Sequence, residues 1–155
     1  MELIDLVKNA KESTYKLQSL SSEIKNKALS EIAKNIEKRK NEIFKANNKD
    51  LEYSKELLNK NKISVSMFNR LKLDENKMLD IISGIKDVIK LEDPINKILA
   101  ETELDDNLIL KKVSCPIGLI AVIFEARPDV ISQISSLCIK SANAVILKGG
   151  SEGEN

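Results

Sequence analysis

Apolar side chains recur at helical spacing through the first 93 residues and then change to the alternation and unbroken runs that are typical of strands. Five helical segments are indicated, and the first carries Leu3, Leu6, Val7 and Ala10 near a 3.6-residue period. The later segments are preceded by residues that cap helices well: Ser21 or Ser22, Asn47 or Asn48, Ser64 or Ser66, and Asp74. Asp93-Pro94 ends the last helix. Residues 1–93 are therefore predicted to form a helical layer.

The pattern after Pro94 predicts a β-hairpin over residues 98–113. The stretch from Ile98-Leu99 to Leu104 and the apolar run Leu108–Leu110 are typical of two strands. The polar triplet Asp105-Asp106-Asn107 between them is typical of a tight turn.

Residues 116–152 predict a strand–helix–strand unit. The run 117–124 is almost continuously apolar, as in strands buried on both faces. Pro128 fits a first helical position, and 129–142 has the length of a crossover helix. The second strand, 144–148, should lie parallel to the first. The fold class is therefore α/β: a helical layer, a hairpin and the first unit of an incomplete Rossmann-like sheet, in one partial cofactor-binding domain over 1–155.

Polar and glycine residues follow both strands of this unit. Since ligands bind beyond the carboxyl ends of parallel strands, Glu125-Ala126-Arg127-Pro128 should share one crevice with Lys148-Gly149-Gly150-Ser151-Glu152. An ammonium, two glycines that allow close backbone approach and a hydroxyl suit an anionic ligand, and the Glu152 carboxylate suits a ribose hydroxyl. The glycine pair matches neither G-x-x-x-x-G-K-[ST] nor G-x-G-x-x-G, so an ordinary strand-to-helix turn is the alternative.

Arg127 stands out because the chain has three arginines beside 22 lysines. Lysine cannot replace the planar, bidentate guanidinium where a site needs that geometry. A solvated surface arginine is the alternative, and the position at a strand end favours a functional role.

Composition and net charge exclude several classes of function. The net charge is +1, so no broad field attracts nucleic acid or a membrane surface, and the lysines are interpreted as solvated helix faces. No histidine is present, which excludes histidine acid–base chemistry and most zinc sites. No apolar run spans a bilayer and no secretory signal is visible, so a cytoplasmic location is expected. Cys115 and Cys138 form no disulfide framework, and neither is in an activating setting.

Two long motifs carry a resemblance to a known family. Cys115–Asp129 and Leu137–Glu152 closely resemble gamma-glutamyl phosphate reductase, also called glutamate-5-semialdehyde dehydrogenase, in the aldehyde dehydrogenase superfamily. Earlier stretches resemble its amino-terminal region: Tyr15-Lys16-Leu17, Leu20-Ser21-Ser22, Ala46–Asp50, Asn69–Leu73 and Leu91–Pro94. The resemblance covers essentially all 155 residues.

The resemblance implies an NADPH-dependent reduction of L-glutamyl 5-phosphate to L-glutamate 5-semialdehyde in proline biosynthesis, with release of phosphate. It implies that Arg127 holds the acyl phosphate or its developing negative charge. Lys148, with help from Ser151 and Glu152, would contact the adenosine ribose or its 2′-phosphate. The full set of cofactor contacts implied is Phe124, Glu125, Ala126, Lys148, Gly149, Gly150, Ser151 and Glu152.

Several features depart from the family pattern. Ala121 and Ala142 stand where glycine is usual, and Asp129 stands where asparagine is common. Family members are several hundred residues long, and their nucleophilic cysteine is expected beyond Asn155, in a catalytic domain absent here. We therefore expect no catalytic residue and no metal site in this chain, and no activity from the chain alone. The alternative is a non-catalytic module that pairs with a complementing carboxyl-terminal fragment or forms a homo-oligomer.

Overall fold

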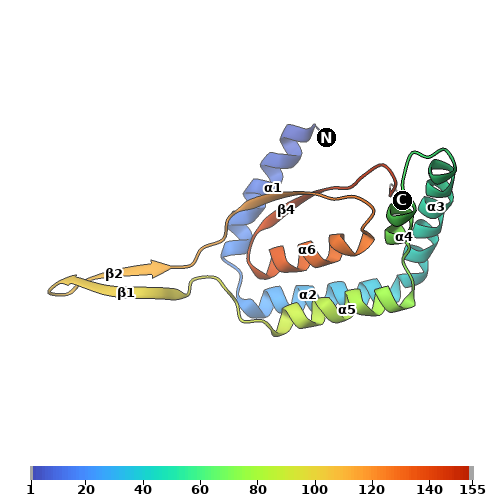
Figure 1. Cartoon of the computed structure of the whole chain (residues 1–155). Helices are drawn as coiled ribbons and strands as arrows, with labels where there is room; N and C mark the ends of the chain where they lie inside the picture. Colours follow the sequence, from blue (N-terminus) through green and yellow to red (C-terminus); the bar gives the residue numbers. More distant parts are fainter. Residues whose placement is uncertain (1, 154–155) are drawn as a thin grey trace.

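The structure, a computed structural model, describes residues 2–153. Helices and strands follow the order expected for the α/β class, with a helical layer, a hairpin and a βαβ unit (Figure 1). The helices are α1 (Leu3–Gln18), α2 (Ser22–Lys38), α3 (Lys40–Asn59), α4 (Val65–Leu71), α5 (Glu75–Lys90) and α6 (Pro128–Lys140). The strands are β1 (Ile98–Asp105), β2 (Leu108–Val113), β3 (Leu119–Ile123) and β4 (Ala144–Lys148).

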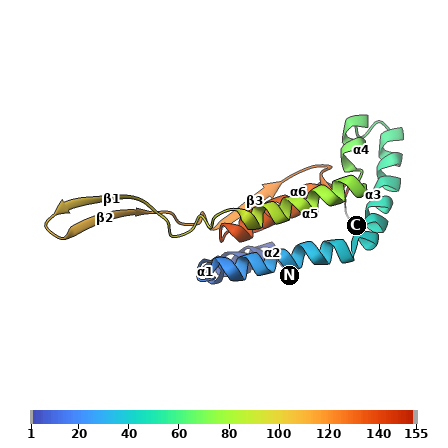
Figure 2. The same ribbon diagram turned by 90° about the horizontal axis from the view of Figure 1, so that it is seen from below.

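The apolar core lies where α2 and α5 run side by side, with α6 packed along them (Figures 1 and 2). Its buried members are Leu29 and Ala33 of α2 and Met78, Ile81, Ile82 and Ile85 of α5. Each helix supplies these residues at 3.6-residue spacing, so one stripe of each is buried. No helix in residues 2–153 is both long and apolar enough to cross a membrane.

Three of the expected caps are confirmed. The side chains of Ser21, Ser64 and Asp74 accept hydrogen bonds from the backbone N–H of the third helical residue of α2, α4 and α5. Each bond satisfies a backbone donor that has no partner inside its helix. These short-range signals locate the three helix starts within one or two residues.

The expected cap at Asn47 or Asn48 is wrong. α3 begins at Lys40 and places Asn47 in its interior, where the side chain is buried. The Asn47 amide Nδ2 donates to the carbonyl of Leu71 at 2.9 Å, and its Oδ1 accepts from the N–H of Leu73 at 3.0 Å. The asparagine therefore satisfies the backbone at the end of α4 and joins α4 to α3.

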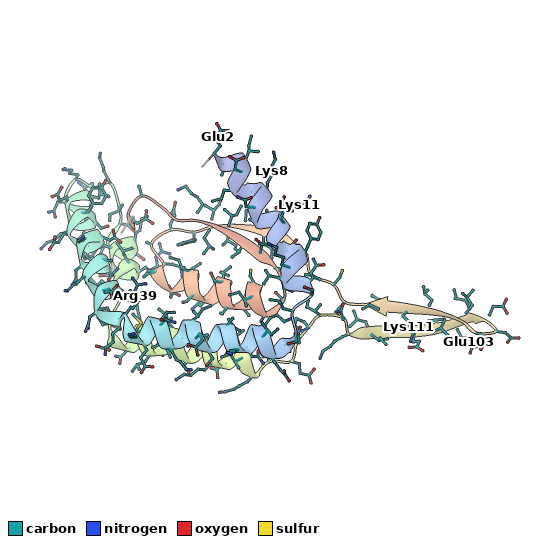
Figure 3. All side chains as sticks on the ribbon, turned by 180° about the vertical axis from the view of Figure 1, so that it is seen from behind. Glu2, Lys8, Lys11, Arg39, Glu103 and Lys111 are labelled. Carbon is teal, nitrogen blue, oxygen red and sulfur yellow. The ribbon has the colours of Figure 1, made fainter. Side chains whose placement is uncertain are left out.

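The hairpin is confirmed, and it projects away from the helical body (Figure 1). Asn107 adopts φ of +62° at the turn, a left-handed conformation that asparagine tolerates. All residues of β1 and β2 are exposed, including large apolar ones. Glu103 and Lys111 lie on this arm (Figure 3). The helical body therefore covers neither face of the arm.

The βαβ unit has the expected parallel strands, paired from Leu119↔Ala144 to Ile123↔Lys148. Two residues after helix α6, Ala142 is left-handed at φ +53°, and the N–H of Asn143 donates to the carbonyl of Cys138 at 2.8 Å. This closing pattern normally uses glycine, and Ala142 takes the left-handed conformation in its place. Burial of the first strand on both faces is not observed, since Ile123 is 82% exposed.

Candidate functional site

The carboxyl ends of β3 and β4 lie next to each other, as the parallel arrangement requires. The N–H of Phe124 donates to the carbonyl of Lys148 at 3.1 Å, which extends the pairing one residue beyond the strands. The segments that follow, 125–128 and 149–153, therefore leave the sheet side by side. The prediction that the two polar motifs are neighbours is confirmed at the level of the backbone.

A cavity of about 600 Å³ lies beside these strand ends. Its wall includes Phe124, Ala126 and Arg127 from the first motif and Gly149, Gly150 and Glu152 from the second. The helical layer supplies the opposite part of the wall, mostly with apolar side chains, among them Ile43, Leu71, Leu73, Met78 and Ile81. The helical layer thus positions the crevice as well as supporting the sheet.

Glu152 occupies the centre of the contact between the two motifs. Its side chain is only 5% exposed, and its carboxylate Oε1 accepts from the N–H of Ala126 at 2.5 Å. Its backbone carbonyl accepts from the Ser54 hydroxyl at 3.3 Å, which fastens the second motif to α3. A Cβ at Gly150 would overlap this carboxylate, so any larger residue there would displace the Glu152 side chain. In this arrangement Glu152 holds the left-handed turn at Ala126, φ +48°, in place.

Arg127 and Lys148 differ in their relation to the cavity. Arg127 lines it and is half exposed, with Nη2 3.0 Å from the Asp129 carboxylate. Lys148 is exposed and is not one of the residues that form the cavity wall, and its ammonium donates to the carbonyl of Gly149 at 2.5 Å. The two cations therefore extend from adjacent strand ends, and only the guanidinium forms part of the wall.

The other predicted cofactor contacts are distributed around the same edge. Phe124 is half buried, and its ring lies 3.6 Å from the place a Cβ would take at Gly149, so a small side chain fits there. Glu125 and Ser151 are exposed to solvent. All eight predicted contacts thus lie at the two strand ends or on the segments that follow them, although only five of them line the cavity.

Sequence reasoning missed the polar residues of α3 at this site. Asn47, Asp50 and Ser54 are buried, and the first two line the cavity. Their spacing of three and four residues places them on one helix face. A polar stripe of small side chains on an otherwise amphipathic helix was the available signal.

Neither cysteine of the chain lies in the cavity wall. Cys138 is buried in α6, and burial raises the pKa of its thiol above the ordinary value. Cys115 is exposed before β3. A buried thiol with a raised pKa is a poor nucleophile, in agreement with the expectation that Cys138 is not in an activating setting.

Comparisons with known proteins place this geometry in context. No family model matches the chain. A gamma-glutamyl phosphate reductase of Brachyspira hyodysenteriae is 80% identical over 155 residues, all of this chain and 36% of the relative. The enzyme of the same name from Acetivibrio thermocellus is 49% identical over 152 residues, 98% of the chain and 34% of the relative.

Two solved structures of proteins with the same name also resemble this chain. The crystal structure of gamma-glutamyl phosphate reductase from Thermotoga maritima matches 99% of this chain and 36% of its own, with a TM-score of 0.91 and 32% identity. The Saccharomyces cerevisiae structure matches 96% of this chain and 37% of its own, with a TM-score of 0.90 and 39% identity. The chain thus spans about a third of the length of these relatives. The chain is homologous over essentially its whole length to gamma-glutamyl phosphate reductases and corresponds to an amino-terminal portion of these relatives.

Proposed function

We propose that this chain forms the cofactor-contacting, amino-terminal part of a cytoplasmic reductase in proline biosynthesis. The complete reaction uses NADPH to convert L-glutamyl 5-phosphate into L-glutamate 5-semialdehyde and releases phosphate. The observation that carries the proposal is the match over the whole chain to relatives named gamma-glutamyl phosphate reductase, at up to 80% identity among those compared. The chain supplies the wall around the strand ends, and the cysteine nucleophile comes from the carboxyl-terminal part found in the relatives.

The residues at the strand ends fit a nicotinamide dinucleotide. A largely apolar cavity of about 600 Å³ beside the carboxyl ends of parallel strands has the position and character of a cofactor site. Gly149 allows a ligand to approach the backbone, and the exposed Lys148 ammonium, which donates to the Gly149 carbonyl, can exchange that bond for one to a phosphate. When bound, the cofactor supplies the hydride. The protein's part is to bind and orient it.

Lys148 provides the sharpest test of the cofactor. If its ammonium meets the 2′-phosphate, Lys148→Gln should weaken binding of NADPH about tenfold, the loss expected for one charge-assisted hydrogen bond, and leave binding of NADH unchanged. Lys8→Gln, an exposed lysine on α1 (Figure 3), is the matched control and should change neither. Binding is measured by fluorescence of the reduced nicotinamide. An equal loss for both cofactors contradicts a 2′-phosphate contact.

Turnover tests the complete proposal. The chain is mixed with the carboxyl-terminal two thirds of the Brachyspira hyodysenteriae relative, and phosphate-dependent reduction of NADP⁺ by glutamate 5-semialdehyde is followed by absorbance. We expect turnover from the mixture and none from either part alone. A mixture that forms a complex, binds NADPH and yet shows no turnover contradicts the proposed reaction.

An interaction module is the second candidate function, because the hairpin arm exposes apolar side chains on both faces. Ile98, Leu99, Leu104, Leu108, Ile109, Leu110 and Val113 are each about half exposed. Exposed strands of this kind pair readily with other chains. The partner we propose is the carboxyl-terminal part of the relatives. A Leu108→Lys/Leu110→Lys variant should then fail to bind that part in size-exclusion chromatography, and retained binding contradicts the module.

A further inference from the structure

A second cavity of about 220 Å³ lies between α4, α5 and the beginning of α6. Its wall includes the charged or polar side chains of Arg70, Lys77, Asp80, Arg127, Asp129 and Gln133. It adjoins the larger cavity, since Arg127 and Ile81 line both. A group held in the smaller cavity would therefore lie next to a molecule bound in the larger one.

Two of the three arginines of the chain meet in this wall. Arg70 comes from the last turn of α4, and Arg127 immediately precedes α6. The chain otherwise uses lysine for positive charge, with 22 lysines. A guanidinium offers a planar pair of donors that matches a carboxylate or phosphate, which an ammonium does not. Convergence of two such rare side chains on one cavity points to an oxyanion ligand.

The partners of the charged groups show which cations are available. Lys77 donates to the backbone carbonyls of Lys72 and Arg70, so its ammonium is engaged at the end of α4. Arg127 pairs with Asp129 through one nitrogen, Nη2. Within residues 2–153, no hydrogen bond or ion pair occupies the guanidinium of Arg70. The guanidinium groups of Arg70 and Arg127 thus both have N–H donors left for a further acceptor.

We propose that Arg70 and Arg127 form an anion subsite that holds one carboxylate or phosphate group between their guanidinium groups. An incoming anion competes with the Asp129 carboxylate for Arg127, and Asp80 adds a second negative charge at the wall. The site therefore discriminates in favour of ligands that bring two or more anionic oxygens. The identity of the anion rests on the proposed function: the substrate of that reaction carries carboxylates and a phosphate.

The small number of arginines makes the subsite directly observable. In a ¹⁵N-labelled chain the arginine Nε–Hε region contains three signals, from Arg39, Arg70 and Arg127. Arg39 lies at the bend between α2 and α3 and pairs with Glu42 at the surface, so it is an internal control (Figure 3). Inorganic phosphate and L-glutamate are titrated separately at constant ionic strength. The Arg70 and Arg127 signals should shift along one saturation curve while Arg39 stays unchanged.

Variants separate a shared site from a local effect. Arg70→Gln should weaken the affinity measured at Arg127 by about tenfold, Arg39→Gln should leave it unchanged, and Asp129→Asn should strengthen it several-fold by removing the competing carboxylate. The backbone amide spectrum of each variant checks that the fold is kept, and Arg70→Lys, which retains the charge, should recover only part of the affinity. The anion that saturates at the lower concentration identifies phosphate or carboxylate as the preferred group.

Two results overturn the subsite. One is a saturable shift at Arg127 alone, and the other is an unchanged affinity in Arg70→Gln. Either leaves the proposed reductase function standing, because Arg127 and the larger cavity do not depend on Arg70. A common curve at both arginines, combined with no NADPH binding and no turnover in the mixed enzyme, has the opposite meaning: the subsite stands and the proposed function fails.

Discussion

The ion pair between Lys25 and Asp93 gives the sharpest prediction about stability. The Lys25 ammonium lies 2.5 Å from the Asp93 carboxylate, and the side chains are 2% and 21% exposed. Asp93 also accepts from the N–H of Ile95 at 3.1 Å, at the start of the link to the hairpin. Lys140, at the end of α6, donates to Asn26 of α2 at 2.7 Å. These contacts join α2, α6 and the segment after α5 at one end of the core.

Asp93→Asn removes the charge that Lys25 needs. Breaking a buried pair usually costs about 3–5 kcal/mol, because the remaining charge stays desolvated. Since Asp93 is a fifth exposed and asparagine still accepts a hydrogen bond, we expect a loss of about 2–3 kcal/mol. Lys25→Met keeps an apolar stem in the core and leaves Asp93 near water and the Ile95 N–H, so its cost should be about 1 kcal/mol.

Urea unfolding of the two single variants and the double variant measures these losses in the free energy of unfolding in a double-mutant cycle. Glu75→Gln is the matched control, since it breaks the exposed pair with Lys40 and should cost less than about 1 kcal/mol. The reasoning predicts that Asp93→Asn is more destabilising than Lys25→Met and that the double variant is less destabilised than Asp93→Asn. An Asp93→Asn loss no larger than that of Glu75→Gln would refute it.

The same pair predicts a dependence on pH. Burial raises the pKa of the Asp93 carboxyl, but hydrogen bonds from Lys25 and Ile95 and the charges of Lys25 and Lys140 outweigh burial and hold the pKa below its usual value. A lowered pKa in the folded state contributes stability that is complete above the unfolded pKa, about 4, and disappears as the pH falls through the folded pKa. The difference between the native chain and Asp93→Asn should therefore shrink below pH 4.

Three further predictions concern local features. Asp74→Ala removes the cap of α5 and should lower the free energy of unfolding by about 1 kcal/mol in urea titrations, and no change would contradict the capping role. A thiol reagent at pH 8 should label Cys115 in the folded chain and Cys138 only in urea, because burial raises the pKa of the Cys138 thiol; equal rates would contradict its burial. Gly150→Ala should displace the Glu152 carboxylate and cost about 1–3 kcal/mol, and an unchanged melting curve would show that the carboxylate moves freely.

Features set by neighbours in sequence were predictable. The caps at Ser21, Ser64 and Asp74 depend on a side chain and an N–H three residues away, and all three are present. The hairpin turn depends on asparagine tolerating a positive φ. Strand β4 begins at the predicted residue because a short apolar run follows a helix of the right length. In each case the physical cause lies within a few residues.

Features set by distant partners were not predictable. Asn47 resembles a helix cap in sequence, yet its hydrogen-bond partners are in the loop after α4, so the helix continues through it. Lys25 and Lys140 look like members of a solvated lysine population and are instead 2% and 3% exposed. Burying an ammonium is tolerable only when a carboxylate or carbonyl arrives from another element. The sequence pattern contains the lysines but not the pairing.

The candidate site combines both kinds of feature, which explains how far sequence reasoning reached. The strand ends were located from local pattern, so Arg127, Gly149 and Gly150 were identified correctly as neighbours of a crevice. The opposite wall comes from α3, α4 and α5, whose approach to the sheet depends on buried contacts such as that of Ser54 with the backbone of Glu152. Because α4 brings Arg70 to the cavity that Arg127 also lines, the helical layer contributes chemistry as well as support. Loosening that layer, for example through Asp93→Asn, should therefore weaken the proposed anion binding at Arg70 more than the proposed cofactor binding at Lys148, which lies on the strand end itself.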